Sequence, residues 1–256
     1  KHLGTDHTEL YVTADQAKAV IPRLPVMYDE PFSDSSQIPT FLVSELARQH
    51  VTVSLSGDAG DELFCGYNRY QMADNLWKKV SIAPVFLRKL VAKALTNIPP
   101  QMWDRIANIL KVLFSQSARS TNFADKLCKG SKLLISQSVD TLFFNLVSLW
   151  PDPESVVVKG LEPPTLLVGN APNLKGLDDV QRMMALDMLT YLPDDILVKV
   201  DRAAMNVSLE TRMPFLDHRV VEFAWTLPQS MKLHKGITKW LLRQVLYRYV
   251  PKKLIE

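Results

Sequence analysis

Three acidic residues and three glycines are crowded into one short segment, Ser54–Tyr67, which reads SLSGDAGDELFCGY. The acids Asp58, Asp61 and Glu62 would repel a bare phosphate group. They fit together if Mg²⁺ bridges carboxylates and polyphosphate oxygens. Free backbone N–H groups in the turn could donate hydrogen bonds to phosphate oxygens, and Gly57 would let a ligand approach the backbone closely. The segment therefore predicts a site for a magnesium-bound polyphosphate.

The same three acids also have a purely structural interpretation. Acidic side chains near the start of a helix cap it and complement its dipole, which stabilises the helix by about 0.3–1 kcal/mol for each acid. Spacing alone does not decide between the two interpretations. The ligand-binding alternative stays open because the segment directly follows an expected strand, and ligands of open parallel sheets bind beyond the carboxyl ends of the strands.

The expected strand is Val51–Leu55, a compact β-favouring run with helical patterns on both sides, which is typical of a buried parallel strand. Upstream of it we expect a short strand at Leu10–Val12 and a helix over Ala14–Ile21, with Thr13 as its N-cap. A loop punctuated by prolines should follow, and then a helix over Pro39–Gln49. Strand, glycine-containing turn and helix start together form half of a doubly wound α/β unit.

Strand signals fade after the acidic segment, and the remainder of the chain is predicted to be mostly helical. We therefore expect an α/β fold in which residues 1–70 form the edge of a small parallel sheet and residues 71–256 form a helical array. The expected helices are Ile82–Ile98, Met102–Phe114, Leu133–Leu149, Asp178–Leu192, Asp194–Met205, Asp217–Ala224 and Thr238–Tyr249.

Composition excludes several classes of protein. The chain has 256 residues, of which 47% are hydrophobic and 22% are charged, as in ordinary globular proteins, and its net charge of +3 is spread along the sequence. We therefore expect no nucleic-acid partner. Two cysteines, Cys65 and Cys128, do not make a disulfide framework. The apolar runs are shorter than the roughly 18 residues that a membrane span needs. A cytoplasmic location is expected, without a membrane partner.

The acidic segment, extended to SLSGDAGDELFCGYNRY, resembles the signature of the synthetase domain of glutamine-dependent asparagine synthetases, which is usually close to LSGDGGDELFGGY. The resemblance continues in order along nearly the whole chain. Its other blocks are LGTDHTELYVT at 3–13, YDEPFSDSSQIPT at 28–40, YLPDDILVKVDRAAM at 191–205, SLETRMPFLDHRVVEFA at 208–224 and GITKWLLRQVL at 236–246.

The resemblance implies a reaction in two steps. ATP and aspartate would form β-aspartyl-AMP and pyrophosphate with Mg²⁺, and ammonia from a glutaminase domain would then convert the acyl group to asparagine, releasing AMP. It also implies the fold of the adenine-nucleotide alpha-hydrolases, the PP-loop ATP pyrophosphatases. A homodimer is one arrangement that the resemblance allows.

The family's functional positions carry over to individual residues in the part of the segment from Ser56 to Glu62, which we call the acidic turn. Ser56 and Gly57 match positions that contact ATP. Asp58 stands where the family has an acid, often glutamate, that is important for forming the acyl-adenylate. Asp61 matches an acid associated with magnesium pyrophosphate, which makes it the expected metal ligand, and Glu62 is its neighbour in the nucleotide site.

Two lysines distant from the turn complete the expected site. Lys239, in TKWLLR, matches a lysine that steadies the phosphate charge during the reaction, so we expect it to be catalytic. Without the resemblance it would be interpreted as a solvated helix lysine. Lys199, in LVKVDR, is a second basic candidate for contacting the nucleotide. The neighbouring Asp201 and Arg202 are expected to form a structural ion pair instead.

The sequence departs from the family pattern in two respects. Ala59 and Cys65 each replace a common glycine; alanine is tolerable if φ stays negative, and Cys65 is expected to serve packing. An SGGxDS pyrophosphate loop, the family's other ATP-binding element, does not occur in the sequence. We expect this loop and its strand to precede Lys1, with a glutaminase domain further upstream, so that the chain alone could be inactive.

Two other functions remain open on the sequence. One is a β-lactam-synthetase-like or other amidotransferase that acts on a different carboxylate, because the pocket residues that select the acceptor cannot be placed. The other is a non-catalytic helical interaction domain, which the missing loop and the two glycine replacements favour. The retained Asp58, Asp61 and Lys239 argue against a scaffold, because a scaffold does not need them.

Overall fold

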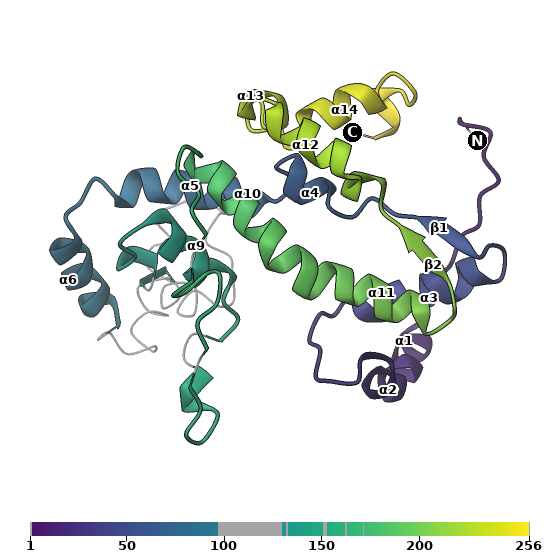
Figure 1. Cartoon of the computed structure of the whole chain (residues 1–256), viewed down its shortest axis with the longest axis horizontal. Helices are drawn as coiled ribbons and strands as arrows, with labels where there is room; N and C mark the ends of the chain where they lie inside the picture. The colour runs from purple at the N-terminus through teal and green to yellow at the C-terminus, as the bar shows by residue number, and fades with distance from the viewer. Residues whose placement is uncertain are drawn as a thin grey trace, which may run out of the picture. The chain divides into compact units, whose positions relative to one another are not determined.

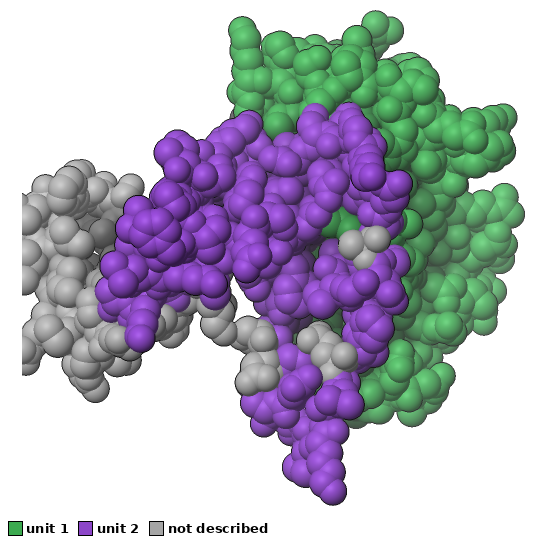
Figure 2. Space-filling model, turned by 60° about the vertical axis from the view of Figure 1, so that its left-hand side comes forward, with its two compact units in different colours: residues 1–68, 184–256 green, residues 69–183 purple. Residues whose placement is uncertain are grey.

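A computed structural model of the chain describes residues 2–96, 130, 131, 133–150, 153–161, 163–170 and 172–255. The chain divides into two compact units, one of residues 1–68 and 184–256 and one of residues 69–183 (Figure 2). Both are mostly helical, and the described strands form one small parallel sheet in the first unit (Figure 1). The helix expected over Met102–Phe114 lies outside the described residues.

The first unit begins with three α-helices, α1 (Ala14–Val20), α2 (Leu24–Tyr28) and α3 (Gln37–Arg48), and a 3₁₀ turn, η1 (Ile21–Arg23), joins the first two. Thr13 caps α1 as expected, in a capping box with Gln16. The prediction of a strand at Leu10–Val12 is wrong: these residues are exposed, and no described strand lies beside them to supply a hydrogen-bonding partner.

Helix α2 lies within the segment that we expected to be a loop. Pro25 stands in its first turn, where the missing N–H costs nothing, so proline starts this helix instead of breaking it. The buried side chains of Val20, Met27, Tyr28 and Phe41 form a core cluster with Ala203 of α11 (Val198–Met205), which joins the first three helices to the second half of the chain.

The expected strand is present as β1 (Val53–Leu55), and it is parallel, as expected. Its partner is β2 (Glu210–Arg212), in register from Val53 opposite Glu210 to Leu55 opposite Arg212. The prediction that the strand is buried is wrong, since the Leu55 side chain is 74% exposed. In the described part of the chain the sheet has two strands, so little apolar surface is available to cover its faces.

Both helices expected over Asp178–Leu192 and Asp194–Met205 are present, and a π-helical turn precedes the second (Figure 1). The elements are α10 (Asp179–Leu189), the π turn η3 (Leu192–Leu197) and α11, which packs against α3. Pro193 lies at the start of the π turn. Because proline has no N–H to donate and its ring crowds the preceding turn, a wider local winding accommodates it.

After β2 the chain forms the remaining short helices of the first unit. The helix expected from Asp217 is confirmed as α12 (His218–Thr226), with Asp217 as its N-cap, and the last predicted helix is confirmed in a shorter form as α14 (Trp240–Leu246). These elements are η4 (Pro214–Leu216), α12 (His218–Thr226), α13 (Gln229–Lys232), α14 (Trp240–Leu246) and η5 (Lys252–Leu254).

The second unit is built from α5 (Asn68–Val80), α6 (Val85–Thr96), α9 (Val139–Val147) and η2 (Pro153–Ser155), with the first part of α10. A buried arginine, Arg88, donates hydrogen bonds to the carbonyls of Ala83, Leu134 and Ser136. Helix α9 covers only the second half of the expected Leu133–Leu149. Within the described ranges, every helix is too short or too polar to cross a bilayer.

Candidate functional site

The acidic turn lies at the carboxyl end of β1, as expected (Figure 1). The Ser56 N–H continues the sheet by donating to the Arg212 carbonyl at 3.0 Å, and the turn closes with a hydrogen bond from Gly60 N to the Gly57 carbonyl at 3.3 Å. The Ser56 hydroxyl donates to Asp58 Oδ2 at 2.7 Å. This hydrogen bond holds the half-buried Asp58 carboxylate against the start of the turn.

Helix α4 (Gly60–Leu63), which follows the turn, has four residues, with Asp61 and Glu62 in its first turn. Two core clusters fix this short helix. Ala59 packs with Leu192 and Ile196 of the π turn, whereas Leu63 packs with Phe64 and Ala224. The rigid frame around the turn therefore comes from segments late in the sequence.

The two residues that replace family glycines both adopt the backbone conformation that favours glycine. Ala59 has φ 69° and Cys65 has φ 56°, so the negative φ that would make alanine tolerable without strain is not present at Ala59. A left-handed conformation costs a residue with a Cβ roughly 1–2 kcal/mol. Both side chains are buried in the core, as the packing role expected for Cys65 requires. The surrounding packing thus holds a left-handed backbone conformation at both positions without a glycine.

The structure brings Asp61 and Lys239 together. Lys239 Nζ lies 2.8 Å from Asp61 Oδ1, and each side chain is about one-third exposed. Gly66 makes this contact possible, because a Cβ on Gly66 would lie 1.9 Å from Asp61 Oδ1 and 2.4 Å from Lys239 Cε. Two residues that the resemblance assigned separately, one to the metal and one to the phosphates, are therefore direct neighbours.

The backbone of Lys239 also contacts the acidic segment. Its N–H donates to the Phe64 carbonyl at 3.2 Å, directly behind the acidic turn. Lys239 is the N-cap of α14 and has φ 52°, an uncommon conformation for a lysine. Residues in such conformations persist where the surrounding structure determines them, and they cluster at functional sites.

Glu62 is almost completely buried, and the Tyr67 hydroxyl donates to its Oε1 at 2.7 Å. Burial raises the pKa of Glu62 above its ordinary value, and the hydrogen bond from Tyr67 only partly offsets this effect. Burial and the same hydrogen bond also raise the pKa of the Tyr67 phenol. The Glu62 side chain is therefore buried in the protein, where its hydrogen bond with Tyr67 can fix the position of the acidic turn.

Lys199 belongs to a second cluster, on α11. Its Nζ lies 2.6 Å from Asp34 Oδ2, and both side chains are largely buried. Burial alone would raise the pKa of Asp34, but hydrogen bonds from Lys199 and Ser36 outweigh it and lower the pKa to about 2. The Tyr28 hydroxyl donates to the Lys199 carbonyl at 3.2 Å. Burial, followed by the charges of Asp34 and Asp195, raises the pKa of Tyr28 to about 12.

The sequence pointed to Lys199 and Glu62 but not to the residues that contact them, Asp34 and Tyr67. Asp34 and Tyr67 received no role, although both lie within segments that carry the resemblance. The signal that could have suggested Asp34 is its position in the YDEPFSDSS block. The expected ion pair of Asp201 and Arg202 is confirmed at 3.5 Å, on the surface.

Carboxylates available for a divalent cation lie on the turn itself. Among the described residues, no three or more histidine, cysteine, aspartate or glutamate side chains form a metal-binding group. Asp58 and Asp61 nevertheless suit Mg²⁺, which is usually held by one or two carboxylates together with phosphate oxygens and waters. The donor set thus fits a metal that arrives with a polyphosphate better than a resident metal ion.

The family model and the curated relatives that match this chain all carry the name asparagine synthase or asparagine synthetase. The family model described as asparagine synthase matches residues 1–256. A Mycobacterium tuberculosis protein provisionally named asparagine synthetase (glutamine-hydrolyzing) is 32% identical over 261 residues, covering 99% of this chain and 36% of its own length. Asparagine synthetase (glutamine-hydrolyzing) 1 of Bacillus subtilis is 29% identical over 267 residues, covering 99% of the chain and 37% of its own length. The chain thus spans little more than a third of these relatives. No solved structure matches it significantly.

Proposed function

Since the chain belongs to the asparagine synthase family, we propose that it supplies part of the ATP site of an amide ligase that forms asparagine from aspartate. The observation that carries this proposal is the paired arrangement of Asp61 and Lys239 at the acidic turn. A carboxylate and a lysine held within hydrogen-bond distance, at the carboxyl end of a parallel strand, suit a magnesium polyphosphate. We further propose that the sheet belongs to a PP-loop fold, with residues 1–70 as its ATP-site edge.

In the proposed first step, a carboxylate oxygen of aspartate attacks the α-phosphorus of ATP. The bond to the β-phosphate bridging oxygen breaks, and pyrophosphate leaves β-aspartyl-AMP behind. In the second step, ammonia attacks the acyl carbon, AMP departs and a proton is lost to give the amide. A free carboxylate is a poor acylating agent, so the protein must align the reactants and neutralise phosphate charge.

We assign the residues of the turn to these tasks. The Gly57 N–H would bind a phosphate oxygen beside Ser56, whose own N–H donates to the Arg212 carbonyl, and Asp58 would act close to the acyl-adenylate. Asp61 would hold Mg²⁺, which supplies charge neutralisation at the pyrophosphate. Lys239 would steady the negative charge as the phosphate bond breaks, because a lysine is a mobile point charge on a flexible stem.

Glu62 and Lys199 are assigned to the support of the nucleotide site. Glu62 would set the position of the turn through its hydrogen bond with Tyr67. Lys199 would support the nucleotide site from α11 through its largely buried ion pair with Asp34. The relatives' names include glutamine hydrolysis, so we propose that a glutaminase domain supplies the ammonia. We propose a cytoplasmic ligase, with a homodimer as its simplest assembly.

Pyrophosphate release by the full-length protein tests this proposal. We expect release that depends on both ATP and aspartate and that falls at least a hundredfold in Asp58→Asn. A panel of other carboxylates, scored by exchange of pyrophosphate with ATP, separates asparagine formation from a β-lactam-synthetase-like reaction. Exchange with another carboxylate but not with aspartate would refute the proposed substrate. Absence of Mg-ATP binding in calorimetry would favour a scaffold.

A further inference from the structure

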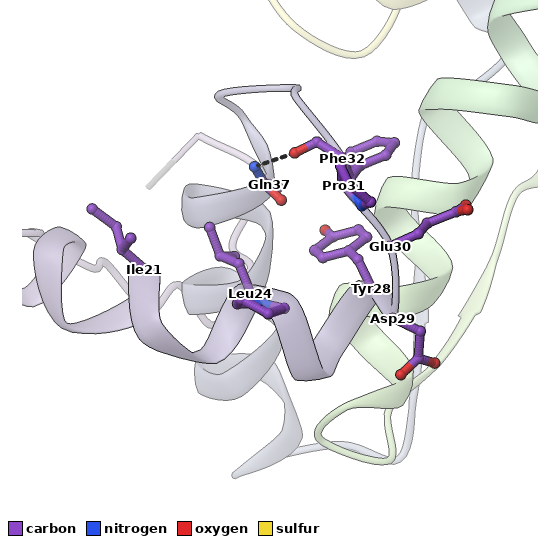
Figure 3. Close-up of a pocket in the computed structure, with 9 residues that line it drawn as sticks. Ile21, Leu24, Tyr28, Asp29, Glu30, Pro31, Phe32 and Gln37 are labelled. Carbon is purple, nitrogen blue, oxygen red and sulfur yellow. Dashed lines mark hydrogen bonds between the residues drawn. The ribbon is translucent and has the colours of Figure 1, made fainter. Parts of the chain in front are cut away.

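A pocket of about 440 Å³ opens beside α2, and its lining residues lie outside the acidic turn (Figure 3). Ile21 and Leu24 form one wall. The other wall is a pair of aromatic rings, Tyr28 and Phe32, which stack face to face with centroids 4.7 Å apart and an interplanar angle of 1°. The volume falls within the range of sites for small molecules, and such sites combine apolar walls with a few oriented polar groups.

One polar side chain of the pocket has an unused hydrogen-bond acceptor. Gln37 is 8% exposed, and its Nε2 donates to the Phe32 carbonyl at 3.3 Å. Its Oε1 is buried and accepts no hydrogen bond from any described residue. In Figure 3 the Gln37 amide nitrogen is hydrogen-bonded to the Phe32 carbonyl oxygen, and the Gln37 amide oxygen is directed into the pocket. A buried acceptor without a donor is unfavourable, so a ligand that supplies an N–H or O–H group would be stabilised here.

The charge at the pocket edge distinguishes between possible donors. Asp29 and Glu30 follow α2 and line the pocket; both are exposed, and neither forms an ion pair with a described residue. Arg23, the nearest arginine along the chain, pairs with Glu45. In Figure 3 both carboxylates are directed away from Gln37, so their negative charge acts from outside the pocket: it attracts a cation to the edge and repels an anion, and the aromatic faces also favour a cation.

We propose that this pocket binds a small apolar ammonium ion, in which an alkyl or aryl group fills the space between Leu24 and the Tyr28–Phe32 pair. The ammonium group donates a hydrogen bond to Gln37 Oε1, and Asp29 and Glu30 provide the electrostatic attraction. The site is separate from the proposed ATP chemistry, since it uses none of the residues assigned to that reaction.

Calorimetric titration of the full-length protein with 2-phenylethylammonium tests the proposal, with 3-phenylpropanoate as a probe of similar shape and opposite charge. We expect binding of the ammonium ion and none of the carboxylate. Gln37→Leu should weaken binding about fivefold or more, because the acceptor is lost. Equal binding of both probes, or no binding of the ammonium ion, would overturn the proposal.

Gln37 is buried, so Gln37→Leu can affect folding as well as binding. A second variant, at an exposed position, therefore tests the same pocket. Ile21 is 52% exposed, so Ile21→Trp can fill the pocket from its edge with little effect on the core. Val26, on the same helical segment but outside the pocket, is 78% exposed and provides the matched control Val26→Trp. We expect Ile21→Trp to lose ammonium binding and Val26→Trp to bind the ammonium ion as the wild type does. Binding that survives Ile21→Trp would overturn the assigned location.

Discussion

Replacing Gly66 by alanine should separate Asp61 from Lys239 without unfolding the protein. The added Cβ would lie 1.9 Å from Asp61 Oδ1, 2.7 Å from Asp61 Cγ and 2.4 Å from Lys239 Cε. These contacts are too short to exist, so the two side chains must rotate away. Backbone strain plays no part, because Gly66 does not adopt a positive φ. The variant therefore tests the ion pair and the space that it occupies.

The expected cost follows from the exposure of the pair. Lys239 and Asp61 are 34% and 35% exposed, and ion pairs of this kind contribute up to about 1 kcal/mol. Moving side-chain ends that can rotate adds a packing cost at the lower end of the usual 1–3 kcal/mol for overpacking. The free energy of unfolding should therefore fall by about 1–2 kcal/mol, which corresponds to roughly 2–8 °C in Tm for a protein of this size.

Urea denaturation of wild type and variants measures this cost. Gly57→Ala is the matched control, since a Cβ at Gly57 meets no atom within 4 Å, and its stability should stay within about 0.5 kcal/mol of wild type. In a Lys239→Ala background, Gly66→Ala should cost about 1 kcal/mol less, because the ion pair is already absent.

Two results would refute the reasoning about Gly66. One is a cost that is the same with Lys239 present or absent, which would locate the effect outside the ion pair. The other is a variant as stable as Gly57→Ala, which would mean that Asp61 and Lys239 do not occupy the space beside Gly66.

Two further predictions concern buried carboxylates and pH. The pKa of Asp34 is lowered to about 2 in the folded state, so its pairing with Lys199 stabilises the protein above pH 4 and is lost as the pH falls from about 4 to 2. Asp34→Asn should thus cost about 2 kcal/mol at pH 7 and progressively less below pH 4, measured by urea denaturation, whereas the exposed Asp201→Asn should change stability little at any pH. The pKa of Glu62 is raised, so its ionisation opposes folding as the pH rises above about 4.5. Glu62→Gln, which keeps an acceptor for Tyr67, should therefore gain stability relative to wild type between pH 4 and pH 8.

Each pH prediction has a result that would contradict it. For Asp34, it is a difference in the free energy of unfolding between Asp34→Asn and wild type that stays constant from pH 7 to pH 3. Such a result would mean that the stabilisation does not depend on ionisation of the Asp34 carboxylate. For Glu62, it is a relative stability of Glu62→Gln that falls as the pH rises. That outcome would mean that the ionised form is the better one in the folded protein.

Local signals explain the parts of the fold that the sequence predicts well. Thr13 and Asp217 each cap a helix within their own few residues, so α1 and α12 are found close to their expected bounds. The helix α2 was missed because Pro25 is ambiguous: proline both ends helices and starts them. Strand β2 was missed because three polar residues, Glu210–Arg212, become a strand only through pairing with β1, far away in the sequence.

The candidate site divides in the same way between local and long-range information. The resemblance pointed to Asp61 and Lys239, and Lys199 was a second basic candidate, but residue spacing holds no information about which charges meet. The pairing of Asp61 with Lys239, and of Lys199 with Asp34, depends on how distant segments pack. The positive φ of Ala59 was also out of reach, because propensity alone favours a negative value and tertiary packing overrides it.

The proposal that the acidic turn and Lys239 bind the phosphates of ATP is tested most directly by calorimetric titration of the full-length protein with Mg-ATP. Lys239→Met removes the proposed phosphate contact, and Lys235→Met removes an exposed lysine nearby in the sequence as a matched control. Because hydrogen bonds to charged groups contribute about 1.5–3 kcal/mol, we predict at least a tenfold loss of affinity for Lys239→Met and an unchanged affinity for Lys235→Met. Equal affinities of wild type and both variants would contradict the proposed site.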